Sequence, residues 1–499
     1  MNLKNILLGI EGLKAKGSLD LDILSIECDY RTVKEGSLFV AIKGYETDGH
    51  KFINQAVENG AKAVIFEEGA DYKEFINNKG ITFIMAPNTR LALSLCSCNF
   101  FDNPSKKMKV IGVTGTKGKT TTTFMIKEIL EKQGKKVGLI GTIAIYIGEK
   151  KVKNSERTTP ESNKLQEILS KMYDLGVEVV VMEVSSQSLK LDRVAGMEFY
   201  AGIFTNLSED HISEKEHANM QEYFECKMKL FDMCKYAYIN ADNIYTTKVP
   251  ELLKDKCKVE TYGIDNHCDF LAKDVTITNT YADFKAKFDK RNERVKISIP
   301  GRFSVYNALA AIKVANLFGV PTETIKEALE NVKVLGRSEL VDNKLDLKIM
   351  IDYAHTPDSL ENILKTAKQY TSGKVICVFG CGGDRDKTKR PLMGEISGRL
   401  ADYTIITSDN PRTEVPEDIV KEIEVGAKKT KGNYECIVDR REAMKKAISM
   451  EGKSDIVIIA GKGHEMYQEI NKEKLPFDER DIIKEIINEL EKEPKKKKK

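Results

Sequence analysis

The chain has 499 residues, of which 41% are apolar and 31% are charged, and its formal net charge is only +3. A chain of this length holds about three or four domains, and this composition is typical of a globular protein rather than a disordered or fibrous one. The small net charge argues against a protein that attracts nucleic acid through its overall field. No uncharged run is long enough to span a bilayer, and the ten cysteines lack zinc or disulfide spacing, so we expect no membrane partner and a cytoplasmic location.

Residues 1–104 mix short strands and helices, and their number suits one small α/β domain. Strand-like runs at 37–42 and 63–66 flank a helical pattern at 52–59. The run at 101–106 carries turn residues and has no apolar period, so we expect a linker there.

From residue 105 to 335 the pattern is a strand followed by a helix, repeated several times. This alternation predicts a mainly parallel sheet covered by helices. The expected strands are 109–114, 136–141, 177–184, 202–205 and 237–240, and the expected helices are 120–133, 160–175 and 304–318.

A second alternating series occupies residues 336–499 and predicts a further, Rossmann-like α/β domain. Its expected strands are 348–353, 374–379, 403–407, 434–438 and 455–460, with a last helix near 481–493. The five lysines that end the chain are expected to be a solvated, disordered tail.

The first strand of the central series leads into a phosphate-binding pattern. It runs into Gly115 and Gly118, and Lys119 and Thr120 follow at the start of a helix. Glycines let backbone N–H groups approach phosphate oxygens, a lysine reaches the terminal phosphates, and a hydroxyl faces Mg²⁺. The spacing departs from the strict Walker A pattern, which would place a glycine at Val113. The alternative is an ordinary glycine-rich turn between a strand and a helix.

Two further candidates stand after strands of the same series. Glu183 ends an apolar run, and His211 follows the run at 205–210. Ligands of open α/β sheets bind at the carboxyl ends of strands, and Mg²⁺ prefers carboxylate and phosphate oxygens, so Glu183 is a candidate metal ligand. The alternative is a structural role for each residue, as a cap, an ion-pair partner or a buried histidine.

Three polar loops follow strands of the C-terminal series, at 380–387, 409–412 and 461–465. The first resembles a dinucleotide turn but has Arg385 in place of the last glycine, which argues against a nicotinamide site. Arg385 and Arg412 can bind carboxylates in bidentate fashion, and Glu465 can bind an ammonium. The sequence therefore favours a zwitterionic ligand, with surface loops joined by local ion pairs as the alternative.

Taken together, these motifs resemble the Mur ligase family along the whole chain except the lysine tail. The motifs that carry the resemblance are 29–31, 36–39, 114–121, 158–161, 183–188, 206–211, 307–311, 336–339, 352–358 and 409–412. The resemblance implies three domains, which hold a uridine nucleotide, ATP and an amino acid respectively.

The implied activity is an ATP-dependent ligation in peptidoglycan precursor synthesis. ATP phosphorylates the D-Glu side-chain carboxylate of UDP-N-acetylmuramoyl-L-Ala-D-Glu, and the amine of meso-2,6-diaminopimelate attacks the acyl phosphate. The cofactors are ATP and Mg²⁺, the partners are small molecules, and a monomer is expected. Open alternatives are the same reaction with L-lysine or another amino acid, a folylpolyglutamate synthase, a P-loop NTPase that acts as a switch, and a phosphate-binding module without turnover.

The resemblance also assigns residues. The implied catalytic residues are Lys119, Lys227 and His211. The implied metal ligands are Thr120, Glu183, His211 and, once carbamylated, Lys227. The implied ATP contacts are Gly115, Thr116, Lys117, Gly118, Lys119, Thr120, Thr121, Asn307, Arg337, Asp352 and His355. The implied contacts of the UDP-substrate are Ser25, Arg31, Thr158, Thr159, Ser185 and Arg193. The implied contacts of the amino acid are Arg385, Asp409, Asn410, Arg412, Gly461 and Glu465.

One position departs from the family pattern, because Tyr30 stands where a serine is usual, and Ser25 is the expected substitute. The choice of amino acid has a physical reason. Diaminopimelate carries a distal carboxylate for Arg385 and Arg412 and a distal ammonium for Glu465. Lysine would leave the arginine charges unpaired, and one such loss costs about 3–5 kcal/mol.

Overall fold

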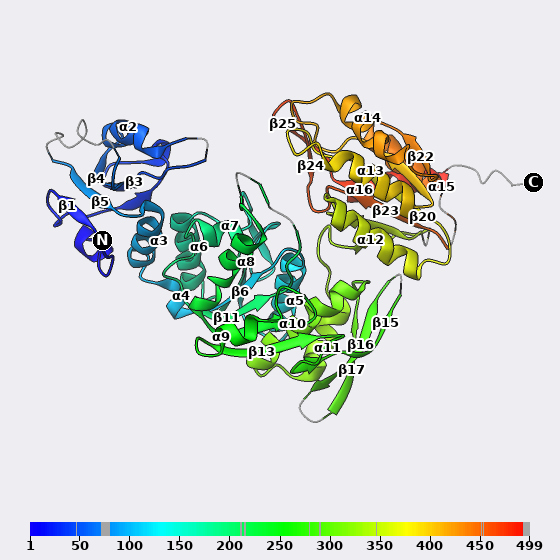
Figure 1. The fold of residues 1–499 in the computed structure, drawn as a ribbon, viewed down its shortest axis with the longest axis horizontal. Coiled ribbons are helices and arrows are strands. Elements are labelled where there is room, and N and C mark those ends of the chain that lie inside the picture. Colours follow the sequence, from blue (N-terminus) through cyan, green and yellow to red (C-terminus); the bar gives the residue numbers. More distant parts are fainter. Residues whose placement is uncertain are drawn as a thin grey trace, which may run out of the picture. The chain divides into compact units, whose positions relative to one another are not determined.

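The computed structural model describes residues 1–45, 47–70, 80–209, 212–213, 216–278, 280–288, 291–345, 347–450, 452 and 454–492. His211 and the lysine tail lie outside these residues. The chain divides into two compact units, which are described separately (Figure 1). The first comprises Met1–Ala272, Lys287–Lys290 and Tyr306–Ala328, and the second comprises Lys273–Ala286, Arg291–Val305 and Leu329–Lys499.

The first unit begins with a five-stranded sheet. Only β1 is antiparallel to its neighbour, and the other pairs are parallel. In spatial order the strands are β1 (Lys14–Lys16), β5 (Thr82–Ala86), β4 (Ala61–Glu67), β3 (Ser37–Val40) and β2 (Ser25–Glu27). The helical segments around it are α1 (Leu3–Ile6), η1 (Tyr30–Thr32), η2 (Gly49–Phe52), α2 (Ile53–Glu58) and α3 (Thr89–Phe100). The strand and helix predictions for this region are confirmed.

The linker expected at 101–106 is wrong in part, because the short helix α4 (Pro104–Lys107) begins inside it. Proline is favoured at the first position of a helix, where its missing N–H costs nothing. Pro104 and Ser105 are buried, and the Ser105 hydroxyl accepts a hydrogen bond from the backbone N–H of Glu198 at 3.2 Å. This segment is therefore packed against its surroundings.

A nine-stranded sheet forms the rest of the first unit. Its strands are parallel except for the antiparallel pairs β7–β8 and β8–β9. In spatial order they are β14 (Phe270–Leu271), β13 (Lys258–Gly263), β12 (Cys234–Asn240), β11 (Phe199–Phe204), β6 (Lys109–Thr114), β10 (Val179–Glu183), β7 (Val137–Ile140), β8 (Ala144–Ile147) and β9 (Lys150–Asn154). The central strands β6 and β10 are almost entirely apolar and buried, as expected for a parallel sheet covered on both faces.

Helices cover both faces of this sheet (Figure 1). One apolar cluster joins the sheet to α6 (Ser162–Asp174), α7 (Ser186–Lys190), α8 (Met220–Met228), η3 (Phe231–Met233) and α9 (Val249–Leu253). Helix α5 (Lys119–Lys132) contacts β6, β7 and β10. Because β6 lies between β10 and β11, the segments that follow these three strands meet at one edge of the sheet, where open α/β sheets bind ligands.

Two longer helices, α10 (Arg302–Leu317) and α11 (Thr322–Asn331), follow a three-stranded sheet in the chain. That sheet contains β15 (Lys273–Ile277), β16 (Ala282–Phe288) and β17 (Arg291–Ile297), and β15 pairs antiparallel with β16.

The main sheet of the second unit has six strands, which are parallel except for β18. In spatial order they are β18 (Glu339–Leu340), β19 (Ile349–Asp352), β23 (Ile456–Ala460), β20 (Val375–Phe379), β21 (Tyr403–Ile406) and β22 (Asn433–Cys436). One face packs against α12 (Pro357–Tyr370), α13 (Lys389–Leu400) and α14 (Pro416–Ala427). The other face packs against α15 (Arg440–Met450) and α16 (Glu479–Lys492) (Figure 1). A hairpin of β24 (Tyr467–Ile470) and β25 (Glu473–Pro476) completes the unit.

The predicted α/β class with two largely parallel sheets is confirmed. The domain limits at residues 104 and 335 stay a prediction. Among the described residues, no helix combines the length and the apolar character needed to cross a bilayer.

Candidate active site

The loop after β6 has a backbone shape that only glycine adopts easily. Gly115 and Gly118 have φ values of +144° and +85°. A Cβ on Gly118 would lie 2.5 Å from Oδ1 of Asn307, and a Cβ on Gly115 would collide with the hydroxyl of Thr205 and approach the carbonyl oxygen of Asn206 to 3.0 Å. The loop is therefore held in a tight turn against the end of β11.

Helix α5 begins directly after this loop, and no side chain caps its first turn. Its N-terminal N–H groups and the positive end of its dipole are thus available to an anion. The ammonium of Lys119 folds back over the loop and donates to the carbonyl oxygens of Gly115 and Thr116 at 2.9 and 3.0 Å. An uncapped helix N-terminus and a lysine over a glycine loop are features that suit a phosphate, and the phosphate site stays a prediction.

Thr120 and Glu183 meet at the edge of the sheet. The Thr120 hydroxyl donates to Oε1 of Glu183 at 3.0 Å. The same oxygen accepts from the backbone N–H of Thr142 at 2.8 Å, and Oε2 accepts from the Thr142 hydroxyl at 3.0 Å. Glu183 is 1% exposed, so a carboxylate and two hydroxyls share one buried position.

Lys227 on α8 reaches the same loop from the other side. Its ammonium donates to the carbonyl oxygen of Gly115 at 2.9 Å, which is also an acceptor for Lys119. It lies 4.4 Å from the ring centroid of Tyr223 and is 1% exposed. A lysine that the sequence alone would place on a helix surface is therefore buried beside the phosphate loop.

The predicted contacts of the UDP-substrate in this unit form one hydrogen-bonded group. The Thr159 hydroxyl donates to the carbonyl oxygen of Glu183 at 2.9 Å and accepts from the backbone N–H of Ser185 at 3.1 Å. Arg193 donates to the carbonyl oxygen of Thr159 at 3.3 Å and pairs with Glu161 at 3.2 Å. Burial lowers the pKa of the Arg193 guanidinium, and Glu161 opposes that shift.

A pocket of about 300 Å³ brings these two groups together. Its lining contains Lys119 and Lys227 from the phosphate side, and Thr158, Thr159, Ser185 and Arg193 from the substrate side. It also contains Arg157, Ser186, Gln187, Glu216 and Tyr223, which the sequence did not single out. Four basic side chains around one pocket suit a ligand with several negative charges.

Two more residues that sequence reasoning missed shape the loop. Asn206 accepts from the backbone N–H of Lys117 at 2.9 Å and donates to the carbonyl oxygen of Lys117 at 3.1 Å. The Thr205 hydroxyl donates to that same carbonyl oxygen at 2.6 Å. Their position directly after a predicted strand was the available signal, since such positions face the ligand edge of a parallel sheet.

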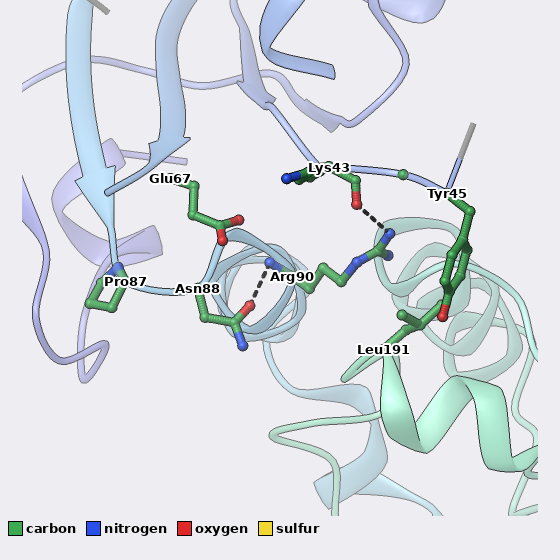
Figure 2. Close-up of a pocket in the computed structure, with 8 residues that line it drawn as sticks. Lys43, Tyr45, Glu67, Pro87, Asn88, Arg90 and Leu191 are labelled. Atoms are coloured by element: carbon green, nitrogen blue, oxygen red, sulfur yellow. Dashed lines mark hydrogen bonds between the residues drawn. The ribbon is translucent and has the colours of Figure 1, made fainter. Parts of the chain in front are cut away.

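A second pocket, of about 460 Å³, lies near β4 and α3 (Figure 2). Its lining includes Lys43, Tyr45, Asn88, Arg90 and Leu191. The Arg90 guanidinium donates to the carbonyl oxygen of Lys43 at 3.0 Å, so one cation is fixed in its wall. This pocket could not be predicted from the sequence, because Leu191 is distant in the chain from the other lining residues.

The structure does not bring Ser25 and Arg31 into the lining of either pocket. The Ser25 hydroxyl shares a hydrogen bond of 2.8 Å with the Ser37 hydroxyl. The exposed Arg31 guanidinium pairs with Asp29 at 2.7 Å, and this hydrogen bond lowers the pKa of the Asp29 carboxyl.

In the second unit, three of the predicted ATP contacts surround the end of β19. Asp352 accepts from the backbone N–H of Ser338 at 2.7 Å, and burial raises the pKa of its carboxyl. The Arg337 guanidinium lies 4.6 Å from the ring centroid of Tyr353. The His355 ring shares a 2.7 Å hydrogen bond with the carbonyl oxygen of Tyr353. Asn307 belongs to the first unit, where it accepts from the Thr122 hydroxyl at 3.2 Å.

The two predicted carboxylate-binding arginines lie against the same glycine. A Cβ on Gly382 would lie 2.9 Å from Nη1 of Arg412 and 3.8 Å from Cγ of Arg385. Arg412 has a φ of +52°, donates to the carbonyl oxygen of Gly383 at 2.7 Å and pairs with Glu469 at 3.2 Å. The Arg412 guanidinium is thus held in place before any ligand arrives.

The remaining predicted amino-acid contacts are also joined. Asn410 donates to Oε2 of Glu465 at 2.7 Å, and the Asp409 carboxylate accepts from the backbone N–H of Asn410 at 2.7 Å. Gly461 has a φ of +118°, and its Cβ would lie 2.5 Å from Oδ2 of Asp409. Glycine is therefore required where the loop after β23 passes the loop after β21.

His217, Glu222 and Cys226 also place possible metal-binding atoms within 4.8 Å of one another. The Glu222 carboxylate, however, pairs with the Lys190 ammonium at 2.7 Å and accepts from the backbone N–H of Ala218 at 2.6 Å. The Lys190 ammonium beside the Glu222 carboxylate disfavours a metal ion at the same carboxylate. We therefore interpret this cluster as part of an ion pair and not as a metal site.

Three protein-family profiles match the chain. A Mur ligase family catalytic domain matches residues 22–96, a Mur ligase middle domain matches 113–315, and a Mur ligase glutamate ligase domain matches 336–463.

Curated relatives and solved structures agree with these matches. The UDP-N-acetylmuramoyl-L-alanyl-D-glutamate–2,6-diaminopimelate ligase of Caldanaerobacter subterraneus subsp. tengcongensis is 47% identical over 493 residues, which cover 99% of this chain and 100% of the relative. The ligase of the same name from Clostridium botulinum is also 47% identical, covering 98% and 100%. A solved structure of a ligase of that name superposes with a TM-score of 0.71 at 29% identity, covering 98% of this chain and 99% of the other.

Proposed function

The chain belongs to the Mur ligase family, and from this membership we propose that it joins meso-2,6-diaminopimelate to the D-Glu side-chain carboxylate of UDP-N-acetylmuramoyl-L-Ala-D-Glu. It is an ATP-dependent carbon–nitrogen ligase of peptidoglycan precursor synthesis. Two relatives that are named for this activity match it along their full length.

One observation carries the proposal. The 300 Å³ pocket places Lys119 of the phosphate loop and the buried Lys227 in one wall with Thr158, Ser185 and Arg193. A ligase that activates an acid with ATP needs its phosphate site and its acid site side by side, because the carboxylate must reach the γ-phosphorus. A P-loop NTPase that acts as a switch would not need an acid-binding group such as Thr158, Ser185 and Arg193 beside its phosphate site.

In the first step a carboxylate oxygen attacks the γ-phosphorus, an O–P bond forms, and the bond to the β-phosphate breaks to release ADP. Lys119 and the N–H groups of the loop and of α5 neutralise the negative charge of the phosphates. Arg193 and the hydroxyls of Thr158 and Ser185 hold the acid substrate. No side chain acts as a nucleophile.

The residues beside the loop suit Mg²⁺. Thr120 and Glu183 offer hydroxyl and carboxylate oxygens at one buried position, and hard cations prefer such donors. A carbamate on Lys227 would add a further carboxylate-like ligand, and His211 completes the set that the family implies. When bound, Mg²⁺ neutralises charge on the transferring phosphate.

In the second step the amine attacks the acyl carbon, a C–N bond forms, and phosphate leaves as the C–O bond breaks. Arg385 and Arg412 bind the distal carboxylate of diaminopimelate, and Glu465 binds its distal ammonium. Arg385 is exposed and Arg412 already pairs with Glu469, so L-lysine would leave no buried arginine unpaired. L-Lysine would still lose the charge-assisted hydrogen bonds that these arginines make to a distal carboxylate, which favours diaminopimelate.

We further propose that residues 1–104, 105–335 and 336–499 are the domains for the uridine nucleotide, for ATP and for the amino acid. Arg90 and Lys43 of the 460 Å³ pocket suit the diphosphate of the UDP-substrate. The protein works as a monomer in the cytoplasm. Its nucleotide substrates occur there, and its scattered free cysteines suit a reducing environment.

A product assay tests the proposal. ATP, Mg²⁺ and UDP-N-acetylmuramoyl-L-Ala-D-Glu are incubated with meso-diaminopimelate, L-lysine or no amino acid, and products are read by mass spectrometry and phosphate release. We expect the tripeptide product with diaminopimelate only. Product with lysine alone would overturn the specificity, and phosphate release without any peptide product would indicate the NTPase alternative.

A further inference from the structure

Lys462 is a charged side chain with no exposed surface, and it lies in the loop that follows β23. Its ammonium donates to Oδ1 of Asn410 at 2.9 Å and to Oε2 of Glu465 at 3.3 Å. Removing an ammonium from water is costly, and the ion pair with Glu465 at 3.3 Å offsets only part of that cost. A role beyond stability is therefore worth testing.

Lys462 is one of two donors that set which way the Asn410 amide faces. Oδ1 of Asn410 also accepts from the backbone N–H of Glu469 at 2.9 Å, so two donors converge on it. Since an amide oxygen only accepts, the NH₂ group must face the opposite side, where it donates to Oε2 of Glu465 at 2.7 Å. Lys462 and the Glu469 backbone together hold the amide in this orientation.

The same contacts fix the Glu465 carboxylate. Both described donors, Lys462 Nζ and Asn410 Nδ2, bind Oε2. Oε1 accepts no hydrogen bond among the described residues, and the side chain is 17% exposed, which leaves Oε1 available to an ammonium of a ligand.

We propose that Lys462 is a positioning residue for the amino-acid substrate: it orients the Asn410 amide and holds the Glu465 carboxylate so that Oε1 receives the distal ammonium. This inference rests on the proposed function. Lys462 touches no substrate itself, and its effect passes through Asn410 and Glu465.

The test replaces Lys462 with Met, which has a similar length and no donor, and with Gln as a second neutral variant should Met impair folding. We expect the KM for meso-diaminopimelate to rise about 10–100-fold, because hydrogen bonds to charged groups are lost. The KM values for ATP and the UDP-substrate should stay within about twofold of wild type, since they bind elsewhere.

Lys474→Met is the matched control. Lys474 is exposed and lies 4.3 Å from the ring centroid of Tyr467, the same ring that lies 5.7 Å from Lys462. The control should keep all three KM values, which separates loss of a general positive charge near Tyr467 from loss of the Asn410 and Glu465 contacts.

A second experiment in the Glu465→Gln variant tests whether Lys462 acts through the Glu465 carboxylate. In this background Lys462→Met should raise the KM for diaminopimelate far less than in wild type, because the positioned carboxylate is gone. An equal rise in both backgrounds, or a joint change of all three KM values with a lower melting temperature, would overturn the positioning role. Wild-type enzyme that makes no product with diaminopimelate would instead overturn the proposed function.

Discussion

At the scale of single residues, the candidate sites are marked by buried cations. Lys227, Arg193 and Lys462 are 1%, 4% and 0% exposed. Lys227 donates to the carbonyl oxygen of Gly115, Arg193 donates to the carbonyl oxygen of Thr159, and Lys462 donates to the Asn410 amide. Burying a charge costs stability even where polar partners are present. Strained or costly groups concentrate where ligands bind, so we interpret these three cations as groups kept for anionic or carboxylate-bearing substrates.

Lys227→Arg tests whether this lysine acts as a carbamate. Arginine keeps the positive charge but does not form the carbamate, so kcat for product formation should fall about 100-fold or more. The rate is measured under saturating substrates with added bicarbonate. Lys229→Arg is the control, because Lys229 is exposed on the same segment and should tolerate the change. A Lys227→Arg enzyme with the wild-type rate would exclude carbamylation.

Glu414 gives a prediction about pH. The Arg390 guanidinium binds it through two hydrogen bonds of 2.9 Å and lowers the pKa of its carboxyl from 4.5 to about 2. A lowered pKa stabilises the fold above the unfolded value of 4.5, and this stabilisation disappears as the pH falls toward 2. Glu414→Gln should therefore lose about 1–3 kcal/mol of unfolding free energy at pH 6.

The measurement is urea unfolding of wild type and Glu414→Gln at pH 6, 4 and 3. The difference in unfolding free energy between the two proteins should be largest at pH 6 and should decrease at each lower pH. A difference in unfolding free energy that stays constant across this range would mean that Glu414 stabilises the fold through its shape and not through its charge.

At the scale of elements, glycines with positive φ stand before and after α5 in different surroundings: Gly115, with a φ of +144°, lies in the loop before it, and Gly134 follows it. A Cβ on Gly115 would collide with Thr205, whereas Gly134, with a φ of +91°, has no atom within 4 Å of that position. Gly115→Ala should therefore abolish ATP binding. Gly134→Ala should cost only about 1–2 kcal/mol of stability and leave ATP affinity intact.

Isothermal titration with ATP and Mg²⁺, together with thermal unfolding, measures both effects. Equal ATP affinity in the two variants would contradict the assignment of the loop after β6 as the phosphate site. The expected pattern is a larger stability loss with lost ATP binding in Gly115→Ala, and a small stability loss with intact ATP binding in Gly134→Ala.

Elements with strong apolar runs could be predicted from the sequence, and elements held by context could not. Strands β20 and β23 are fully buried apolar runs, and β6 and β10 are almost entirely apolar and buried, with the exposed Lys109 and the buried Glu183 at their ends; all four were predicted. Strand β9 was not, because all five of its residues are exposed and its sequence is rich in lysine. It exists because the β8–β9 pairing adds it to the edge of a sheet, which is a tertiary effect.

The candidate site shows the same division. Gly115, Gly118 and Lys119 form a local motif whose chemistry can be inferred from spacing alone. Lys227 could be assigned only through the family resemblance, because nothing in its own segment indicates that α8 turns it toward Gly115. Thr142 could not be found at all, since its contact with Glu183 joins segments 41 residues apart.

At the scale of the whole molecule, the residues proposed for the two half-reactions belong to different units. The described contacts among Lys119, Thr120, Glu183, Lys227 and Arg193 all lie in the first unit. The contacts among Asn410, Arg412, Lys462 and Glu465 all lie in the second. Activation of the acid and selection of the amine are therefore separable, although predicted ATP contacts occur in both units.

This separation predicts opposite effects for two conservative changes. Arg412→Lys loses the planar group that donates to Gly383 and pairs with Glu469, so the KM for diaminopimelate should rise about tenfold or more while the KM for the UDP-substrate stays unchanged. Arg193→Lys should raise the KM for the UDP-substrate and leave that for diaminopimelate unchanged, because its contacts are Thr159 and Glu161.

Trapping of the acyl-phosphate intermediate tests independently whether the two units serve different steps. Without an amino acid, hydroxylamine should trap the acyl phosphate as a hydroxamate at the wild-type rate in Arg412→Lys, and more slowly in Arg193→Lys at limiting UDP-substrate. This pattern requires that the first unit activates the acid before the second supplies the amine. If Arg412→Lys slowed trapping as much as it slowed product formation, the arginine would serve the first step, and the assignment of the second unit to the amine would be wrong.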